Sequence, residues 1–408
     1  MKTLIALAIL ALQTMTAHAQ SCTVKVGRIL PQTGPLAEVT KDSPWVDDHK
    51  IGPINSAGGL KVGDQRCRIE YKIYDSKSTI AGSADAATRA ILQDKVDVLM
   101  ALGTPDTTNA PSDLCERHQI PCIMAGTPIE AWLFGPDGKP KTYKHAFMFF
   151  FSVVDLVKNH IGMIKEPPGG FNGNIGYLYP NDPDGTIFAS LFDPEFKKAG
   201  WNPTDPGRFA QGLPDFTPII NKFKRARVEV VTGVLAPPDL QNYLQQAAQQ
   251  GFKPKMYVID KATGYPEPMN ALGKHGEGVV SVNFWSPAFP GKSKYGGYDG
   301  EGLVQAYEKS TGKQYIPPLA LNDASYDVLF DALQRAGSTD RAALLKALRA
   351  TALETVTGTV KFNEQNYSVQ PLGGAQWRED PKQNRLVKEN VYNAVFPSVK
   401  KTAEMKLY

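Results

Sequence analysis

The beginning of the sequence contains the feature that most limits what this chain can fold into. Residues 24–37 contain an apolar strand pattern followed by a turn with proline and glycine. A helix-like stretch comes next and ends at Ile54–Leu60 (INSAGGL), where two adjacent glycines allow a tight turn. A second strand then runs into Ile73–Lys77 (IYDSK). This order predicts a βαβ unit, with parallel strands and a short loop at the carboxyl end of the first strand.

Residues 1–19 have the features of a secretory signal peptide. Lys2 supplies the basic start, an apolar run follows, and Ala17-His-Ala19 fits the small-x-small cleavage pattern. The apolar run is too short to anchor the chain in a bilayer. We therefore expect cleavage after Ala19 and a periplasmic location. Lipid attachment at Cys22 is the less favoured alternative, because no branched apolar residue stands three positions before it.

The length and net charge of the chain limit the number of lobes and the kinds of partner that we expect. The mature chain of 389 residues (408 minus 19) is long for one hydrophobic core, so two lobes are expected. The formal net charge is +4, which falls to +3 without Lys2. The densest basic cluster, Lys222–Arg227 (KFKRAR), comes late in a helix-like stretch, where cations suit the negative end of the helix dipole. We expect no nucleic-acid partner.

Strand-like and helix-like patterns alternate almost to the end of the chain, which predicts an α/β fold with mostly parallel sheets. Asp239–Gly251 places its apolar side chains on one helix face and stops at a glycine, and Asn322–Gly337 does the same. Ser338–Arg341 then begins a further helix. The predicted strands are 23–30, 69–75, 96–102, 120–124, 174–179, 228–235, 255–259 and 278–284.

In their order and in their residues, these segments resemble the Leu/Ile/Val-binding protein family, the type I periplasmic solute-binding proteins of ABC importers. The resemblance is carried first by residues 24–37, by Ile54–Leu60 and by Ile73–Lys77, and it continues through the mature chain. It implies two doubly wound parallel-sheet lobes joined by a three-strand hinge, the periplasmic binding protein-like I fold. The ligand would lie between the lobes, at the carboxyl ends of the strands, and the hinge would close around it.

The resemblance also divides the chain into lobes. The aromatic string Phe147–Phe151 resembles the family's first crossing between lobes, and the local pattern alone predicts a buried strand there. The family's plan places the other crossings near 282–286 and 354–358. We therefore expect lobe one to contain 20–149 and 285–355, and lobe two to contain 150–284 and 356–408.

Four cysteines in an exported chain favour disulfide bonds. Cys22 and Cys67 precede the first two sheet strands, which would be parallel neighbours. Cys115 and Cys122 flank a helix end and the next strand. Of the three connectivities we favour 22–67 with 115–122. Metal binding is the weaker alternative, because the chain lacks CxxC and histidines at ligand spacing.

Two loops of lobe one are the candidate carboxylate site. Thr107 and Thr108 follow strand 96–102, and small hydroxyl residues at a strand-to-helix turn suit a carboxylate. The resemblance implies that they hold the ligand's carboxylate, although the Asp106 before them is unusual. Helix capping is the simpler alternative for both threonines. The second loop follows strand 120–124, and its candidates are Ala125, Gly126 and Thr127.

The candidates of lobe two depart further from the family. Tyr179 ends a strand, and Asp184 stands before Gly185 where the family has tyrosine before glycine. Ala236 lies where the family closes over an α-amino group. Asp260 and Lys261 share the place where a glutamate pairs with the ammonium in amino-acid binders.

One residue of register decides between Asp260 and Lys261. A cleft-facing Asp260, with Asp184, would suit an amino acid, whereas a cleft-facing Lys261 would suit a second anionic group or an oxygen-rich ring. Both residues could instead be solvated loop charges. Trp285 lies at the second crossing and is a candidate for stacking on a flat ligand, against packing within the hinge. The apolar and aromatic residues favour aromatic or branched carboxylates.

Enzyme motifs are missing from the sequence: there is no Gly-x-Ser-x-Gly, no His-Glu-x-x-His and no Walker loop. We therefore expect a binding protein rather than an enzyme, with no cofactor and no metal. The favoured function is capture of a small carboxylated solute, an amino acid or an aromatic or branched carboxylate, for an inner-membrane ABC permease. The protein would act as a monomer. A periplasmic sensor that presents its ligand-bound form to a membrane receptor is the alternative.

Overall fold

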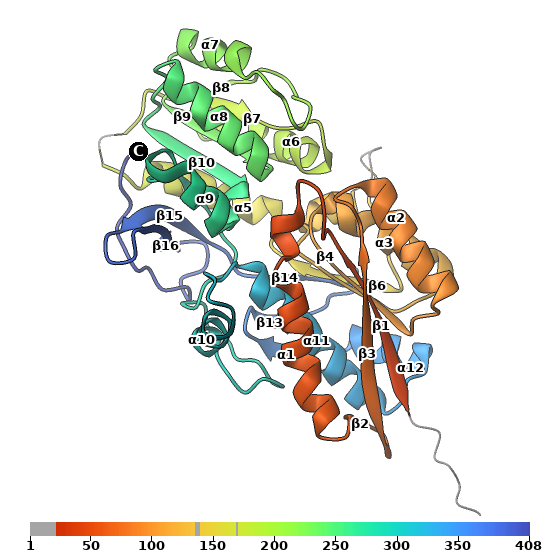
Figure 1. Ribbon diagram of the computed structural model, residues 1–408. Helices are drawn as coiled ribbons and strands as arrows, with labels where there is room; N and C mark the ends of the chain where they lie inside the picture. Colours follow the sequence, from red (N-terminus) through yellow and green to blue (C-terminus); the bar gives the residue numbers. More distant parts are fainter. Residues whose placement is uncertain (1–21, 135–138, 169) are drawn as a thin grey trace, which may run out of the picture.

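The computed structural model describes residues 22–134, 139–168 and 170–408, which form two lobes side by side (Figure 1). The predicted signal peptide and its cleavage after Ala19 lie outside these residues. Each lobe has a seven-stranded sheet with helices on it. The prediction of an α/β fold with two mostly parallel sheets is confirmed.

The sheet of lobe one is parallel except at one edge, where β2 runs antiparallel to β3. Its central strand β4 (VLMAL) is buried at every residue, as expected for a parallel strand covered on both faces. In spatial order the strands are β14 (Tyr367–Val369), β6 (Ala146–Phe150), β5 (Cys122–Ala125), β4 (Val98–Leu102), β1 (Thr23–Leu30), β3 (Gln65–Asp75) and β2 (Leu60–Val62).

The helices of lobe one come from both ends of the chain. α1 packs on α11, and α11 packs on α12, although α1 and α11 lie far apart in the sequence (Figure 1). The helices are α1 (Ser43–Ser56), α2 (Ile80–Thr88), α3 (Pro105–His118), α4 (Ile129–Leu133), α10 (Gly300–Thr311), α11 (Pro318–Ala336) and α12 (Arg341–Arg349).

The sheet of lobe two is parallel from β8 to β11 and ends in two antiparallel strands. In spatial order it contains β16 (Arg385–Tyr392), β15 (Gly373–Asp380), β11 (Val280–Asn283), β10 (Met256–Lys261), β9 (Val230–Leu235), β7 (Asn174–Leu178) and β8 (Asn202–Thr204). Its helices are α5 (Val153–Lys165), α6 (Pro183–Lys198), α7 (Thr217–Arg225), α8 (Pro237–Gln249) and α9 (Pro266–Leu272).

The third crossing between the lobes differs from the family's plan. Residues 352–361 form a hairpin of β12 (Ala352–Thr355) and β13 (Gly358–Lys361), and β14 then pairs with β6 of lobe one. The chain therefore crosses at 370–372, rather than near 354–358, and residues 356–369 lie in lobe one. Such short strands carry too little periodicity to reveal their sheet, because their place depends on pairing with a distant edge strand.

A buried polar network fastens the two sequence segments of lobe one together. Arg28 Nε of β1 lies 3.0 Å from Asp47 Oδ1 of α1, and Arg28 also donates to Asn322 of α11. Lys50 Nζ of α1 lies 2.7 Å from Asp327 Oδ1 of α11. Buried charges need partners to offset lost hydration, so these contacts fix how α11 docks.

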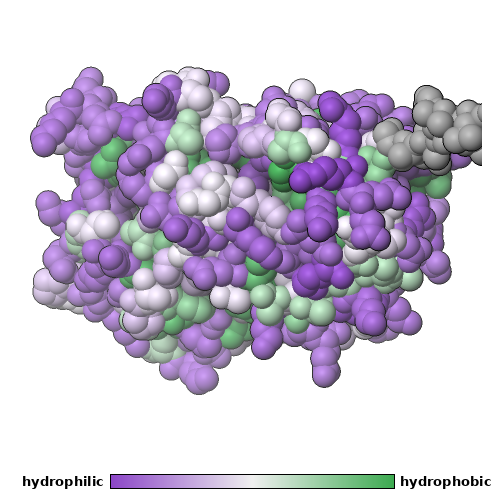
Figure 2. All heavy atoms as spheres, turned by 90° about the horizontal axis from the view of Figure 1, so that it is seen from below, coloured by the Kyte–Doolittle hydropathy of each residue, from purple (hydrophilic) through white to green (hydrophobic). Residues whose placement is uncertain are grey.

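Both disulfide bonds join the cysteines as favoured, Cys22 to Cys67 and Cys115 to Cys122, with sequence separations of 45 and 7. Within the described ranges, no helix has the length and apolar character needed to cross a membrane. The face in Figure 2 is mostly hydrophilic, with apolar residues in small groups.

Replacing Cys22 and Cys67 together by serine should destabilise lobe one by roughly 4 kcal/mol, because the bond closes the longer loop and restricts the unfolded chain. The Cys115→Ser, Cys122→Ser pair should cost roughly 2.5 kcal/mol by the same loop-length relation. Urea unfolding of the two double variants measures both values. A larger loss from the shorter loop would contradict this account.

Asp42, at the start of α1, is a buried carboxyl group with neither oxygen hydrogen-bonded to another described residue. Burial raises the pKa of Asp42 from 3.8 to about 8. The unfolded chain releases this proton near pH 4, whereas the folded protein keeps it until about pH 8. The folded state therefore binds more protons in this interval, and its stability falls as pH rises through it.

Asp42→Asn should remove this pH dependence. Asparagine is an equally good residue at a helix start, so the variant should be more stable than the parent at pH 8–9, by roughly 1–3 kcal/mol, and similar near pH 4. Urea unfolding across this pH range measures the difference. The exposed Asp64 provides a control, Asp64→Asn, which should leave the profile unchanged.

Candidate functional site

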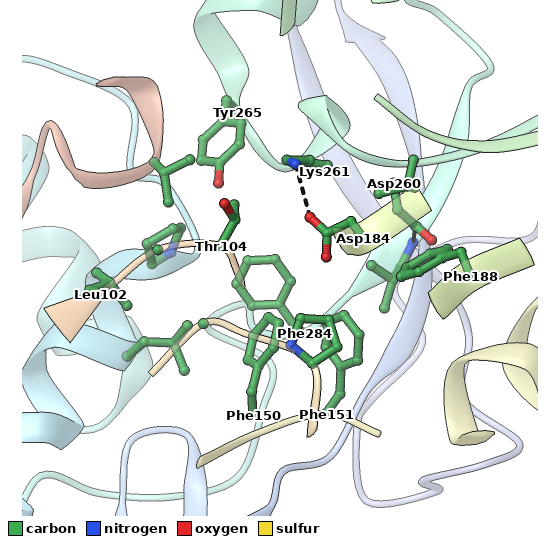
Figure 3. Close-up of a pocket in the computed structure, with 18 residues that line it drawn as sticks. Leu102, Thr104, Phe150, Phe151, Asp184, Phe188, Asp260, Lys261, Tyr265 and Phe284 are labelled. Carbon is green, nitrogen blue, oxygen red and sulfur yellow. Dashed lines mark hydrogen bonds and ion pairs between the residues drawn. The ribbon is translucent and has the colours of Figure 1, made fainter. Parts of the chain in front are cut away.

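A cavity of about 60 Å³ lies between the lobes, at the carboxyl ends of the strands of both sheets (Figure 3). That volume holds several water molecules or a small organic group. The lobes touch around it, since α6 of lobe two contacts α3 and α4 of lobe one. The structure therefore shows the two lobes in contact beside the cavity.

From lobe one, Leu102, Gly103 and Thr104 line the cavity at the junction between β4 and α3. Gly126, which follows β5, also lines it. Thr104 is the N-cap residue of α3. Its hydroxyl group and that of Tyr265, from lobe two, point into the cavity from opposite sides (Figure 3).

The threonines predicted to hold a carboxylate lie behind this surface. Thr107 forms a capping box with Thr104, in which the Thr104 N–H donates to Thr107 Oγ1 at 3.2 Å. Thr108 Oγ1 and Thr127 Oγ1 are 2.6 Å apart, and Thr127 donates to Gly103 O. All three side chains are fully buried and absent from the cavity lining. Thr108 and Thr127 hold the two loops together, whereas Thr107 caps α3, as the simpler alternative for that residue predicted.

Ala125 and Gly126 have different roles in the second loop. Ala125 is buried as the last residue of β5, whereas Gly126 lines the cavity with φ +90°. A Cβ on Gly126 would meet Gly103 O at 2.8 Å. Glycine therefore permits both the backbone conformation and the close approach of the two loops.

From lobe two, both Asp260 and Lys261 line the cavity, which resolves the choice of register. Neighbouring residues of a strand normally point to opposite faces. Lys261 ends β10 with φ +69° and ψ −80°, and this turn allows its side chain to reach the cavity beside Asp260. Asp260 accepts a hydrogen bond from Val282 N at 2.8 Å, and its other oxygen lies 2.8 Å from His160 Nε2.

Lys261 is the centre of a cluster with Asp184, Asp182 and Asp106, which we call the Lys261 cluster. Its Nζ lies 2.8 Å from Asp184 Oδ2, 3.4 Å from Asp182 Oδ2 and 4.0 Å from Asp106 Oδ2. Asp182 and Asp184 begin α6, and Asp106 begins α3 of the other lobe. Within the described ranges, no group of His, Cys, Asp and Glu side chains is arranged to hold a metal ion.

The charges in this cluster shift one another's proton affinity. Burial alone lowers the pKa of Lys261, but Asp184, Asp182 and Asp106 outweigh it, so the net pKa is raised and the ammonium is kept. Burial raises the pKa of Asp184 to about 6, although the nearby Lys261 opposes the change. Burial likewise raises the pKa of Asp106.

Aromatic rings form the apolar wall of the cavity. Phe150 and Phe151 come from the first crossing and Phe284 from the second, and their rings gather on one side (Figure 3). The centroids of Phe284 and Phe150 are 5.1 Å apart. Phe188 lines the cavity from α6, four residues after Asp184 and hence on the same helix face.

Three further predicted residues, all from lobe two or the second crossing, also do not line the cavity. Tyr179 is buried among the aromatic residues of lobe two, with Arg208 over its ring. Ala236 is the buried N-cap of α8. Trp285 is buried and donates from Nε1 to Val356 O at 2.7 Å, a packing role, while its neighbour Phe284 lines the cavity.

Sequence reasoning missed Thr104, Tyr265 and the phenylalanines of the wall. Two signals were available: Thr104 directly follows a strand at an N-cap position, and Phe188 has helical spacing from Asp184. Nothing local marked Tyr265, because its place depends on packing against residues of lobe one that are distant in the sequence, Leu36, Val39 and Ile316.

Two α/β lobes with a cavity between them, at the carboxyl ends of their strands, are the architecture of a periplasmic solute-binding protein. The chain belongs to the periplasmic binding protein family, whose model matches residues 23–382. It is 25% identical to Leu/Ile/Val-binding protein homolog 7 of Brucella abortus over 421 residues, covering 100% of this chain and 99% of that protein.

Solved structures share the fold. The leucine-binding protein LivK of Thermotoga maritima superposes with a TM-score of 0.76 at 19% identity, covering 91% of this chain and 99% of that one. A solute-binding protein of an ABC transporter from Rhodopseudomonas palustris BisB5, in complex with 3,4-dihydroxybenzoic acid, gives 0.74 at 19% identity, covering 93% and 99%.

Gly126→Ala should lower ligand affinity by roughly tenfold, because about 1–3 kcal/mol of backbone strain and the contact with Gly103 O would separate the two loops. Isothermal titration of each variant with the small molecule that copurifies with the wild-type protein measures this change. Gly52→Ala is the matched control, since a Cβ there meets nothing within 4 Å on an α1 turn. Equal affinity in both variants would contradict a role for the Gly126 loop.

Proposed function

We propose that this protein captures a small carboxylated organic solute in the periplasm and delivers it to an ABC permease in the inner membrane. The observation that carries the proposal is the cavity between the lobes, with an apolar aromatic wall facing a buried ammonium. The family's periplasmic transport role supports the delivery step.

The cavity has the features that a carboxylated ligand with an apolar body requires. Phe150, Phe151 and Phe284 would bury the apolar part, which is worth roughly 25 cal/mol for each Å² removed from water. The hydroxyl groups of Thr104 and Tyr265 are hydrogen-bond donors around the same space. Lys261 adds a positive charge, and hydrogen bonds to charged groups are the stronger kind.

The relatives support this class of ligand. The Thermotoga maritima neighbour is named as a leucine-binding protein, and the Rhodopseudomonas palustris neighbour holds an aromatic carboxylic acid. Both ligands combine a carboxylate with an apolar body. In this proposal the protein performs no chemistry on its ligand, acts as a monomer, and begins at Gln20 after export.

The proposal is tested by identifying what the protein binds. Mass spectrometry of the small molecules released on denaturation should show a stoichiometric carboxylate when the protein is purified from its native periplasm. The same compound should stabilise ligand-free protein by about 2.7 kcal/mol at one hundred times its Kd, measured by thermal unfolding. Protein that is stabilised by no amino acid and by no aromatic or branched acid would contradict the proposal.

A further inference from the structure

The Lys261 cluster has the carboxylate acceptors of an ammonium-binding site, and the protein's own lysine occupies it. Carboxylates from both lobes converge on one nitrogen, which carries three donor hydrogens. Figure 3 shows the shortest of these contacts, the pair of Lys261 with Asp184. The side chains of Lys261, Asp182 and Asp184 are each only 5% exposed. A bound ammonium group would be recognised by this same arrangement of acceptors.

The backbone conformation of Lys261 is one that residues with a side chain rarely adopt, which indicates that surrounding contacts hold it in this position. Its φ of +69° with ψ −80° is rare for a residue with a side chain, and such conformations persist where surrounding contacts enforce them. Here the enforcing contacts are the ion pairs to the start of α6. The lysine is therefore directed into the cluster rather than out to solvent.

The carboxylates around the cavity already have partners. Asp182 accepts from Gly185 N at 2.7 Å and from Gln211 Nε2 at 2.6 Å, besides its contact with Lys261. Asp260 accepts from Val282 N and lies against His160. An ammonium on the ligand would have to compete with the ammonium of Lys261 for these carboxylates, and the two positive charges would repel each other.

We infer that Lys261 takes the place of a ligand's α-amino group, so that this protein selects carboxylates with an aromatic or branched apolar body and no amino group. The inference rests on the proposed function and narrows its ligand class. Asp106 is the most distant of the three partners and comes from the opposite lobe. A ligand carboxylate would take this position and complete the coordination of the ammonium.

Matched pairs of ligands that differ only in the amino group test the inference. Leucine is compared with 4-methylpentanoate, and phenylalanine with 3-phenylpropanoate, by isothermal titration of ligand-free wild-type protein. In each pair that binds, the acid without the amino group should bind at least tenfold more tightly. An amino acid that binds as tightly as its partner, or more so, overturns the inference but leaves the proposed function intact.

Benzoate and 3,4-dihydroxybenzoate extend the series to acids whose carboxylate is attached directly to the aromatic ring. Binding of either, without binding of leucine or phenylalanine, supports the inference. If no carboxylate binds, the proposed function fails, and the inference fails with it.

Lys261→Met, which keeps the chain length but removes the ammonium, tests the residue itself. The emptied carboxylates should now accept a ligand ammonium, so the preference within each pair should shift toward the amino acid by at least tenfold. Lys158→Met is the control, because Lys158 forms an exposed pair with Asp155 on α5. It should leave the preference unchanged. The wild-type titrations decide the inference even if Lys261→Met does not fold, and an unchanged preference in folded Lys261→Met overturns it.

Discussion

The burial of the Lys261 ammonium is the constraint on which the arrangement of this site depends. A charge removed from water is tolerated only when other charges and dipoles replace its hydration. Here that replacement requires the first turn of α6, the end of β10 and the first turn of α3 to meet at one point. Because α3 belongs to the other lobe, the same requirement favours the closed arrangement of the lobes.

A second ion pair between lobes lies at the edge of the cleft, where Lys41 Nζ is 2.6 Å from Glu267 Oε2. Glu267 is mostly exposed, so this pair is screened by solvent and contributes less than a buried one. Closure therefore relies on the groups around the cavity: the charges of the Lys261 cluster on one side and the phenylalanine wall on the other. A ligand that contacts both sides would stabilise the closed state by what it gains only there.

Lobe one shows how a discontinuous chain can form a rigid half of a binding site. Its last helix pair arrives after the chain has built most of lobe two, and Arg28, Asp47 and Asn322 then join the early and late segments. Removing one member would leave the others buried without a partner, which costs more than the pair itself contributes. This network fixes α1 and α11 against β1 within lobe one, which is joined to lobe two by the crossings at 151–152, 284–287 and 370–372.

The sequence by itself determined the βαβ order, most strands, the cysteine pairs and the loops that approach the cleft, because periodicity and turn residues act locally. Tertiary structure alone decided which side chains reach the cavity. Thr107 turned inward as a capping residue and Thr108 turned inward against Thr127. Phe284 lines the cavity in place of Trp285, and a single positive φ brought Lys261 beside Asp260. The hairpin at 352–361 likewise joined lobe one through pairing of β14 with a distant edge strand. Such choices depend on contacts between remote segments and on the cost of burying charge, and neither leaves a local pattern in the sequence.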